Sequence, residues 1–141
     1  MTKIQAIIDT VAATAGAVFG FLYGEVTGLF WALIALMALD YITGVVIAII
    51  AKKLSSSVGF KGLAKKLTIL VFIAMGHIID TYILGGTPAL MSAVMLFYFA
   101  NEGISIVENA VRLGLPVPEK LKDILEQIKK EGDKDDNDRN N

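Results

Sequence analysis

The sequence contains no cysteine, which excludes disulfides, thiolate metal sites and cysteine nucleophiles. It also contains a single histidine, His77, so a histidine-based metal site is improbable. Charged residues are scarce, at 19%, whereas 55% of the residues are hydrophobic and the mean hydropathy is +0.62. Thirteen basic and 14 acidic residues nearly balance, which indicates neither a nucleic-acid partner nor an acidic substrate. This composition is typical of a membrane protein.

Long apolar stretches predict an all-α membrane protein with about four transmembrane helices, because a spanning helix needs about 20 mainly apolar residues. The predicted spans are residues 4–23, 29–51, 67–84 and 88–110. The first is the weakest, since it is rich in Ala and Gly and contains Asp9. Its alternatives are a cleaved signal peptide and a re-entrant or interfacial helix, and three spans are possible.

Basic residues predict how the chain is oriented. The segment between the second and third spans carries five lysines and no acid, which makes it cytoplasmic by the positive-inside rule. These topology-setting residues are Lys52, Lys53, Lys61, Lys65 and Lys66. Residues 55–66 are either a basic loop or an interfacial helix beginning near Ser57. Four spans then place both termini in the cytoplasm, in a multi-pass protein.

Beyond residue 115 the composition changes, which divides the chain into a membrane domain, residues 1–115, and a cytoplasmic segment, residues 116–141. Apolar residues at helical spacing within EKLKDILEQIKK predict one short amphipathic helix. It docks on a partner, a sister subunit or the membrane, or it remains solvated. Gly132 is expected to end this helix, and the charged tail after it to be disordered.

No catalytic motif, cofactor-binding loop or metal-ligand spacing is present, so we expect neither an enzyme nor a cofactor. Instead, each predicted span carries an acid: Asp9, Asp40, Asp80 and Glu102. An ionised carboxylate in hydrocarbon costs about 2.5–3.5 kcal/mol, and such groups usually face a bundle interior, a partner or water. They either line a wet path or hydrogen-bond neighbouring helices.

The depth of each polar residue along its span indicates which of these side chains could meet. Asp40, Asn101 and Glu102 lie at similar depths below the outer ends of their spans and could meet. His77 and Asp80 share a helix face nearer the outer side. Thr87 is expected to cap the last span, because Pro88 suits its first turn.

Glycine recurs at every fourth position through Gly16, Gly20, Gly24 and Gly28. Glycines at this spacing form a smooth helix face that allows close packing of another helix, within the chain or between chains. The last two could instead belong to the turn that follows.

Three segments, in order, resemble the phage holin family of the toxin secretion/phage lysis type. They are LDYITG (39–44), SSSVGFKGLAKK (55–66) and NEGISIVENAVRLGLPVPEKLKDIL (101–125). The resemblance covers roughly residues 30–126, and its most distinctive part is NEGISIVENA followed by GLPVPEKL. The positions that it marks as important are Asp40, Thr43, Gly44, Asn101, Glu102, Glu108 and Asn109.

The resemblance implies a protein that accumulates in the cytoplasmic membrane of a bacterial host, in contact with lipid, and oligomerises with itself. At a set time it opens lesions through which an endolysin, or in some relatives a toxin, crosses without necessarily touching it. We expect Asp40 to be neutral, or paired with Thr43, Asn101 or Glu102, until association turns this polar face towards water. The competing hypotheses are a small ion-conducting or proton-coupled membrane protein, and an adaptor that recruits partners through residues 119–131.

Overall fold

The computed structural model describes residues 2–137, which form five helices and, within that range, no strand. The helices are α1 (Lys3–Tyr23), α2 (Gly28–Ile50), α3 (Ser56–Tyr82), α4 (Ala89–Arg112) and α5 (Glu119–Asn137). The first four are each long and apolar enough to cross a membrane. The predicted all-α architecture with four candidate spans is therefore confirmed.

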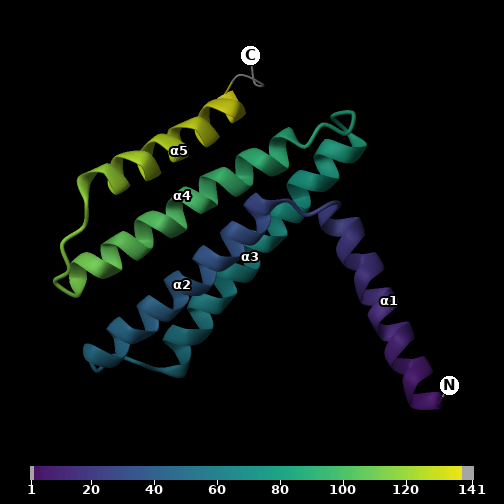
Figure 1. Ribbon diagram of the computed structural model, residues 1–141, viewed down its shortest axis with the longest axis horizontal. Helices are drawn as coiled ribbons and strands as arrows, with labels where there is room; N and C mark the ends of the chain where they lie inside the picture. The colour runs from purple at the N-terminus through teal and green to yellow at the C-terminus, as the bar shows by residue number, and fades with distance from the viewer. Residues whose placement is uncertain (1, 138–141) are drawn as a thin grey trace.

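Helices α2, α3 and α4 pack together around one apolar core (Figure 1). The buried residues of this core come from all three helices: Phe30, Leu33, Met37, Ile69, Ile73, Met91 and Met95. Many other large apolar side chains are exposed on the outside, such as Trp31, Val71 and Ile42. An apolar exterior around a packed interior is what a hydrocarbon environment requires.

Helix α3 differs from its sequence-based bounds. The third span was expected to begin at residue 67, after a basic loop or a separate interfacial helix, but α3 begins at Ser56 and runs unbroken to Tyr82. The hydroxyl of Ser55 caps it by accepting from the Val58 N–H at 3.2 Å. The residues before Leu67 thus form the N-terminal part of α3, and Lys65 and Lys66 lie within this helix.

Helix α1 leaves the bundle and extends away from the other helices (Figure 1). None of its residues is buried. Its contacts lie near its last turns, where the Tyr23 hydroxyl donates to the Leu70 carbonyl at 3.3 Å and the Phe19 ring meets Phe30 edge-on. The following turn needs Gly24, which has a φ of +61° and lies against the His77 ring. Most of α1 is therefore free to contact lipid or another chain.

Helix α5 follows a turn at residues 113–118 and runs back along α4, on the side away from α2 and α3 (Figure 1). The expectation that Gly132 would end this helix is wrong, because α5 continues to Asn137. Gly132 is buried against the backbone of α4 instead. Residues 133–137 of the predicted disordered tail are therefore helical, and residues 138–141 lie outside the described range.

Candidate functional site

Three charged side chains lie at one level of the bundle because of where the helices end. Asp40 is ten positions from the end of α2, Lys66 ten from the start of α3, and Glu102 ten from the end of α4. These helix ends belong to the same side of an antiparallel bundle, so each residue lies about 15 Å from that side. The three charges must therefore face one another if they point inwards.

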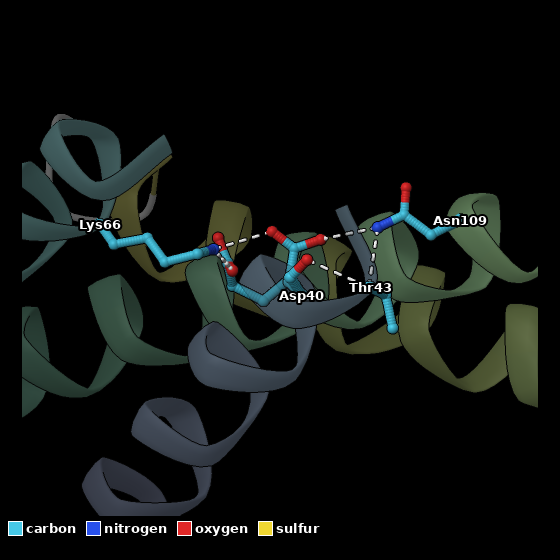
Figure 2. A network of polar contacts seen from close by, with 5 residues as sticks. Asp40, Thr43, Lys66 and Asn109 are labelled. Carbon is cyan, nitrogen blue, oxygen red and sulfur yellow. Dashed lines mark hydrogen bonds and ion pairs between the residues drawn. The ribbon is translucent and has the colours of Figure 1, made fainter. Parts of the chain in front are cut away.

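The side chains do point inwards, and Lys66 connects the other two. Its ammonium donates to Asp40 Oδ2 at 2.8 Å and also to Glu102 Oε2. The exposed fractions of the side chains are 10% for Lys66, 14% for Asp40 and 3% for Glu102. Figure 2 shows Lys66 reaching across to the Asp40 carboxylate. We call Asp40, Lys66 and Glu102 the ionic triad.

A second pair of polar residues holds the opposite side of Asp40 (Figure 2). The Asn109 amide donates to Asp40 Oδ1 at 3.3 Å and to Thr43 Oγ1 at 2.9 Å. The Thr43 hydroxyl in turn donates to the Asp40 carbonyl at 3.0 Å. Both carboxylate oxygens of Asp40 are thus bonded, and one connected network joins α2, α3 and α4. Such a network stabilises the bundle only while its members remain satisfied.

The triad has more negative than positive charge. One ammonium faces two carboxyl groups, so the cluster carries one excess negative charge unless a carboxyl holds a proton. Exposed Val46, Ile49 and Ile50 lie on α2 between Asp40 and the helix end, which places the triad inside the apolar zone. An unbalanced charge at this depth favours access to a proton or to water.

A cavity of about 210 Å³ lies beside the triad and gives it room for water. Asp40, Lys66 and Asn109 line it, together with Ser105. Tyr41 also borders the cavity, with its ring packed on Gly59 and Gly62 of α3. The site is therefore polar and borders a cavity. It lies beside the contact between α2 and α3, where the two glycines allow the Tyr41 ring to pack closely.

Asp80 has a different environment from the triad. It is 1% exposed, and its two oxygens accept from the Leu90 N–H at 2.9 Å and the Met91 N–H at 2.7 Å. The first N–H groups of a helix have no partner within the helix, and a carboxylate there also suits the helix dipole. Asp80 therefore caps α4 from α3. Thr87, which the sequence suggested as the cap, makes no side-chain capping bond, and the N-cap residue is Pro88.

The structure brings together some of the residues that the sequence singled out and separates others. Asp40, Thr43, Glu102 and Asn109 share the network described above. His77 lies near Asp80, where it contacts Gly24. Outside the network lie half-buried Asn101, exposed Glu108, Gly44 beside the cavity, and Asp9, which is exposed on α1 and accepts from Gln5.

The glycine repeat makes no close helix contact within the chain. A Cβ at Gly16, Gly20 or Gly28 would meet nothing within 4 Å, and Gly24 belongs to the turn. The expected close packing of Gly16 and Gly20 is therefore absent inside the described chain. Close packing does occur at Gly76, where a Cβ would lie 3.0 Å from Met91 Cα. Gly76 is not part of the four-residue glycine repeat, so the repeat does not identify it.

Lys66 is the main network residue that the sequence reasoning missed. It was grouped with the loop lysines, but it is buried within α3, whereas Lys52, Lys53, Lys61 and Lys65 are exposed. Its distance from the α2–α3 turn indicates the buried position, because residues equally far from the connection of an antiparallel hairpin lie side by side. Asp40 and Lys66 are such a pair.

Four helices long and apolar enough to cross a membrane, three of which pack around a buried polar network, define the class of the protein, an all-α membrane protein. The sequence profile of the bacteriophage holin family matches residues 17–130, and the chain belongs to that family.

Several bacterial proteins are similar to the chain. One from Listeria innocua is 49% identical over 110 residues, 78% of either chain. Another, from Halalkalibacterium halodurans, is 42% identical over 130 residues, which cover 89% of this chain and 96% of the relative. A 14.9 kDa protein of Clostridium perfringens, described by its place in the nagH 3' region, is 38% identical over 80% of this chain and 86% of its own length. All three are uncharacterized proteins, and no solved structure matches.

Proposed function

We propose that the protein is a holin that accumulates in the bacterial cytoplasmic membrane, oligomerises and opens timed lesions. An endolysin, or an exported toxin, then crosses the membrane without needing to bind the protein directly. Membership of the bacteriophage holin family supports this function. The relatives in Listeria and Clostridium support a bacterial setting, and the four candidate spans support a membrane location.

The observation that carries the proposal is the buried triad of Asp40, Lys66 and Glu102. In a single subunit the Lys66 ammonium bonds both carboxyl groups, which holds α2, α3 and α4 together and keeps the polar face closed. When subunits associate, the same three side chains can pair with those of another subunit or face water. The contact that joins α2, α3 and α4 is then lost, and the helices can separate. Because association depends on subunit concentration, accumulation supplies the trigger.

The orientation proposed for this action has both termini in the cytoplasm. Its support is the placement of Lys52 and Lys53, exposed in the α2–α3 turn, and of Lys61, exposed near the start of α3. Arg112 ends α4 on that same side. The opposite turns, residues 24–27 and 83–88, carry Glu25 as their one charged residue.

Ion conduction is the second candidate, because the triad and its cavity also resemble a proton or cation site. A fixed ion-conducting oligomer would depolarise cells gradually and in proportion to its expression. A holin would leave the potential intact until a defined time and then abolish it abruptly.

The test measures culture density and membrane potential together during induced expression in a bacterial host, with and without a cytoplasmic endolysin. We expect abrupt depolarisation at a reproducible time and rapid lysis only when the endolysin is present. Graded depolarisation without endolysin-dependent lysis would replace the holin proposal with ion conduction.

A further inference from the structure

The turn between α2 and α3 lies at one end of the bundle and carries positive charge that no acid balances (Figure 1). Lys52 and Lys53 lie in the turn and Lys61 lies near the start of α3, and all three are exposed. No acidic residue occurs in the sequence 41–79. Within the part of the chain that the structure describes, none of these three lysines forms an ion pair. We call Lys52, Lys53 and Lys61 the basic end.

The backbone of Lys52 has a conformation that is unfavourable for a lysine. Its φ is +54°, and it is the only non-glycine residue of the described chain with a positive φ. Lys52 follows the C-cap of α2, a position where glycine is common because glycine adopts this conformation without strain. A lysine is therefore the less stable choice for the turn itself, and no ion pair within the described chain offsets the strain.

The helix dipoles account for only part of this charge. The C-terminal end of α2 carries a partial negative charge, which favours cations at Lys52 and Lys53. Lys61 instead follows the N-terminal end of α3, where the partial charge is positive. A negatively charged partner outside the chain would account for all three lysines.

Exposed apolar side chains accompany the lysines. Leu54 follows Lys53, and Phe60, which precedes Lys61, is 74% exposed. A dissolved anion or an acidic protein surface would pair with the ammonium groups but leave these apolar side chains in water. A surface of anionic phospholipid offers phosphate groups to the lysines and hydrocarbon to Phe60 and Leu54 at the same time. The mixture of charges and apolar groups therefore favours a lipid partner.

We propose that the basic end binds the headgroups of anionic phospholipids, with its three ammonium groups on the phosphates and the Phe60 ring at the start of the acyl chains. The inference rests on the proposed function, because the orientation proposed there turns this end towards the cytoplasmic leaflet of a bacterial membrane. The negative potential of an anionic leaflet attracts lysines near it, and salt screens this attraction. The basic end therefore selects anionic over zwitterionic lipids, and added salt weakens the selection.

The test compares how strongly two lipids quench a tryptophan at the basic end. Trp31 is the only tryptophan of the chain, so Trp31→Phe with Phe60→Trp moves the probe from the start of α2 to the basic end. The purified full chain is reconstituted in vesicles of phosphatidylcholine and phosphatidylglycerol in equal parts, in which one or the other lipid is brominated. We expect brominated phosphatidylglycerol to quench the Phe60→Trp probe several-fold more strongly than brominated phosphatidylcholine. Trp31 in the unmodified chain should be quenched equally by both lipids.

Charge variants of the probe chain show whether the lysines cause the preference. Lys53→Gln with Lys61→Gln should remove most of it, whereas Lys53→Arg with Lys61→Arg should keep it because arginine retains the charge. Lys120→Gln with Lys130→Gln is the matched control, since it removes two exposed lysines from α5 and should leave the preference unchanged. Lys52→Asn guards against a misfolded turn: asparagine tolerates the left-handed conformation, so the turn should persist while the preference falls.

The outcomes separate this inference from the proposed function. Equal quenching by the two lipids, in a chain that still causes abrupt depolarisation and endolysin-dependent lysis, would overturn the lipid surface and leave the holin function intact. A preference that survives Lys53→Gln with Lys61→Gln would overturn its assignment to the basic end. If the variants behave as expected but the unmodified chain causes neither depolarisation nor lysis, the lipid surface stands and the holin function fails.

Discussion

The ammonium of Lys66 lies 2.8 Å from the Asp40 carboxylate and simultaneously donates to Glu102. Because α2, α3 and α4 each contribute one member, this contact ties together the three helices that form the apolar core. Breaking a buried ion pair by removing one partner costs about 3–5 kcal/mol, whereas replacing all partners by neutral groups is often tolerated. The triad is therefore easily unbalanced by a single substitution.

Lys66→Met should lower the free energy of unfolding by about 3–5 kcal/mol, because two carboxyl groups lose their cation. The triple variant Asp40→Asn, Lys66→Met and Glu102→Gln should recover much of that loss. Thermal unfolding in detergent, followed by circular dichroism, measures both. The control is Lys65→Met, which removes the exposed neighbouring charge. Equal effects of the Lys65 and Lys66 substitutions would contradict the triad's structural importance.

Asp40→Asn tests the part of the triad in triggering. The amide keeps much of the shape but removes the negative charge that repels Glu102, which leaves one ammonium facing one carboxyl group and stabilises the closed arrangement. We expect the onset of depolarisation to be delayed at equal expression. Asp9→Asn, an exposed acid on α1, should leave the onset unchanged. Unaltered timing and permeability for Asp40→Asn would remove Asp40 from the mechanism.

The membrane helices were predictable because length and hydropathy alone define them. The bounds of α1, α2 and α4 lie within two residues of the ranges expected from the sequence. The start of α3 was not predictable in this way, because Lys61, Lys65 and Lys66 interrupt the apolar run while the helix continues through them. A hydropathy pattern detects the lipid-facing length of a helix and not its full hydrogen-bonded length.

The site was predictable only in part, for a related reason. Residues such as Asp40 and Glu102 stand out because they are polar within apolar runs, but Lys66 sits at the border of such a run and resembles its exposed neighbours. Gly132 was misread because glycine often ends helices, and only tertiary contact with α4 explains its place inside α5. Whether such a residue is buried or exposed depends on how the helices pack, which the pattern of a single sequence does not specify.

Asp80→Ala should destabilise the fold by about 1–3 kcal/mol, since the Leu90 and Met91 N–H groups would lose their acceptor in a buried place. Asp80→Asn should cost less, because its single carbonyl oxygen still accepts one bond. The comparison is Thr87→Ala, which removes the cap suggested by sequence and should have little effect. Melting in detergent gives the order, and a larger loss for Thr87→Ala would refute capping by Asp80.

Gly76→Ala should be destabilising by about 1–3 kcal/mol, because the added methyl group would meet the Met91 backbone and overpack the α3–α4 contact. Gly44→Ala provides the matched substitution in a helix with open space around the Cβ, and there the higher helix propensity of alanine should be neutral or stabilising. Unfolding temperatures of the two variants should therefore shift in opposite directions or by clearly different amounts. Equal shifts would contradict the close approach at Gly76.

Gly16→Leu with Gly20→Leu separates contacts within the chain from contacts between chains. A Cβ at either position meets nothing within the chain, so unfolding of the isolated protein should not change. If α1 packs on a second copy, the added bulk should reduce chemically crosslinked oligomers in the membrane several-fold and delay depolarisation. Thr14→Leu, on the opposite face of α1, controls for added volume. Unchanged oligomers and timing would assign Gly16 and Gly20 to lipid contact rather than to self-association.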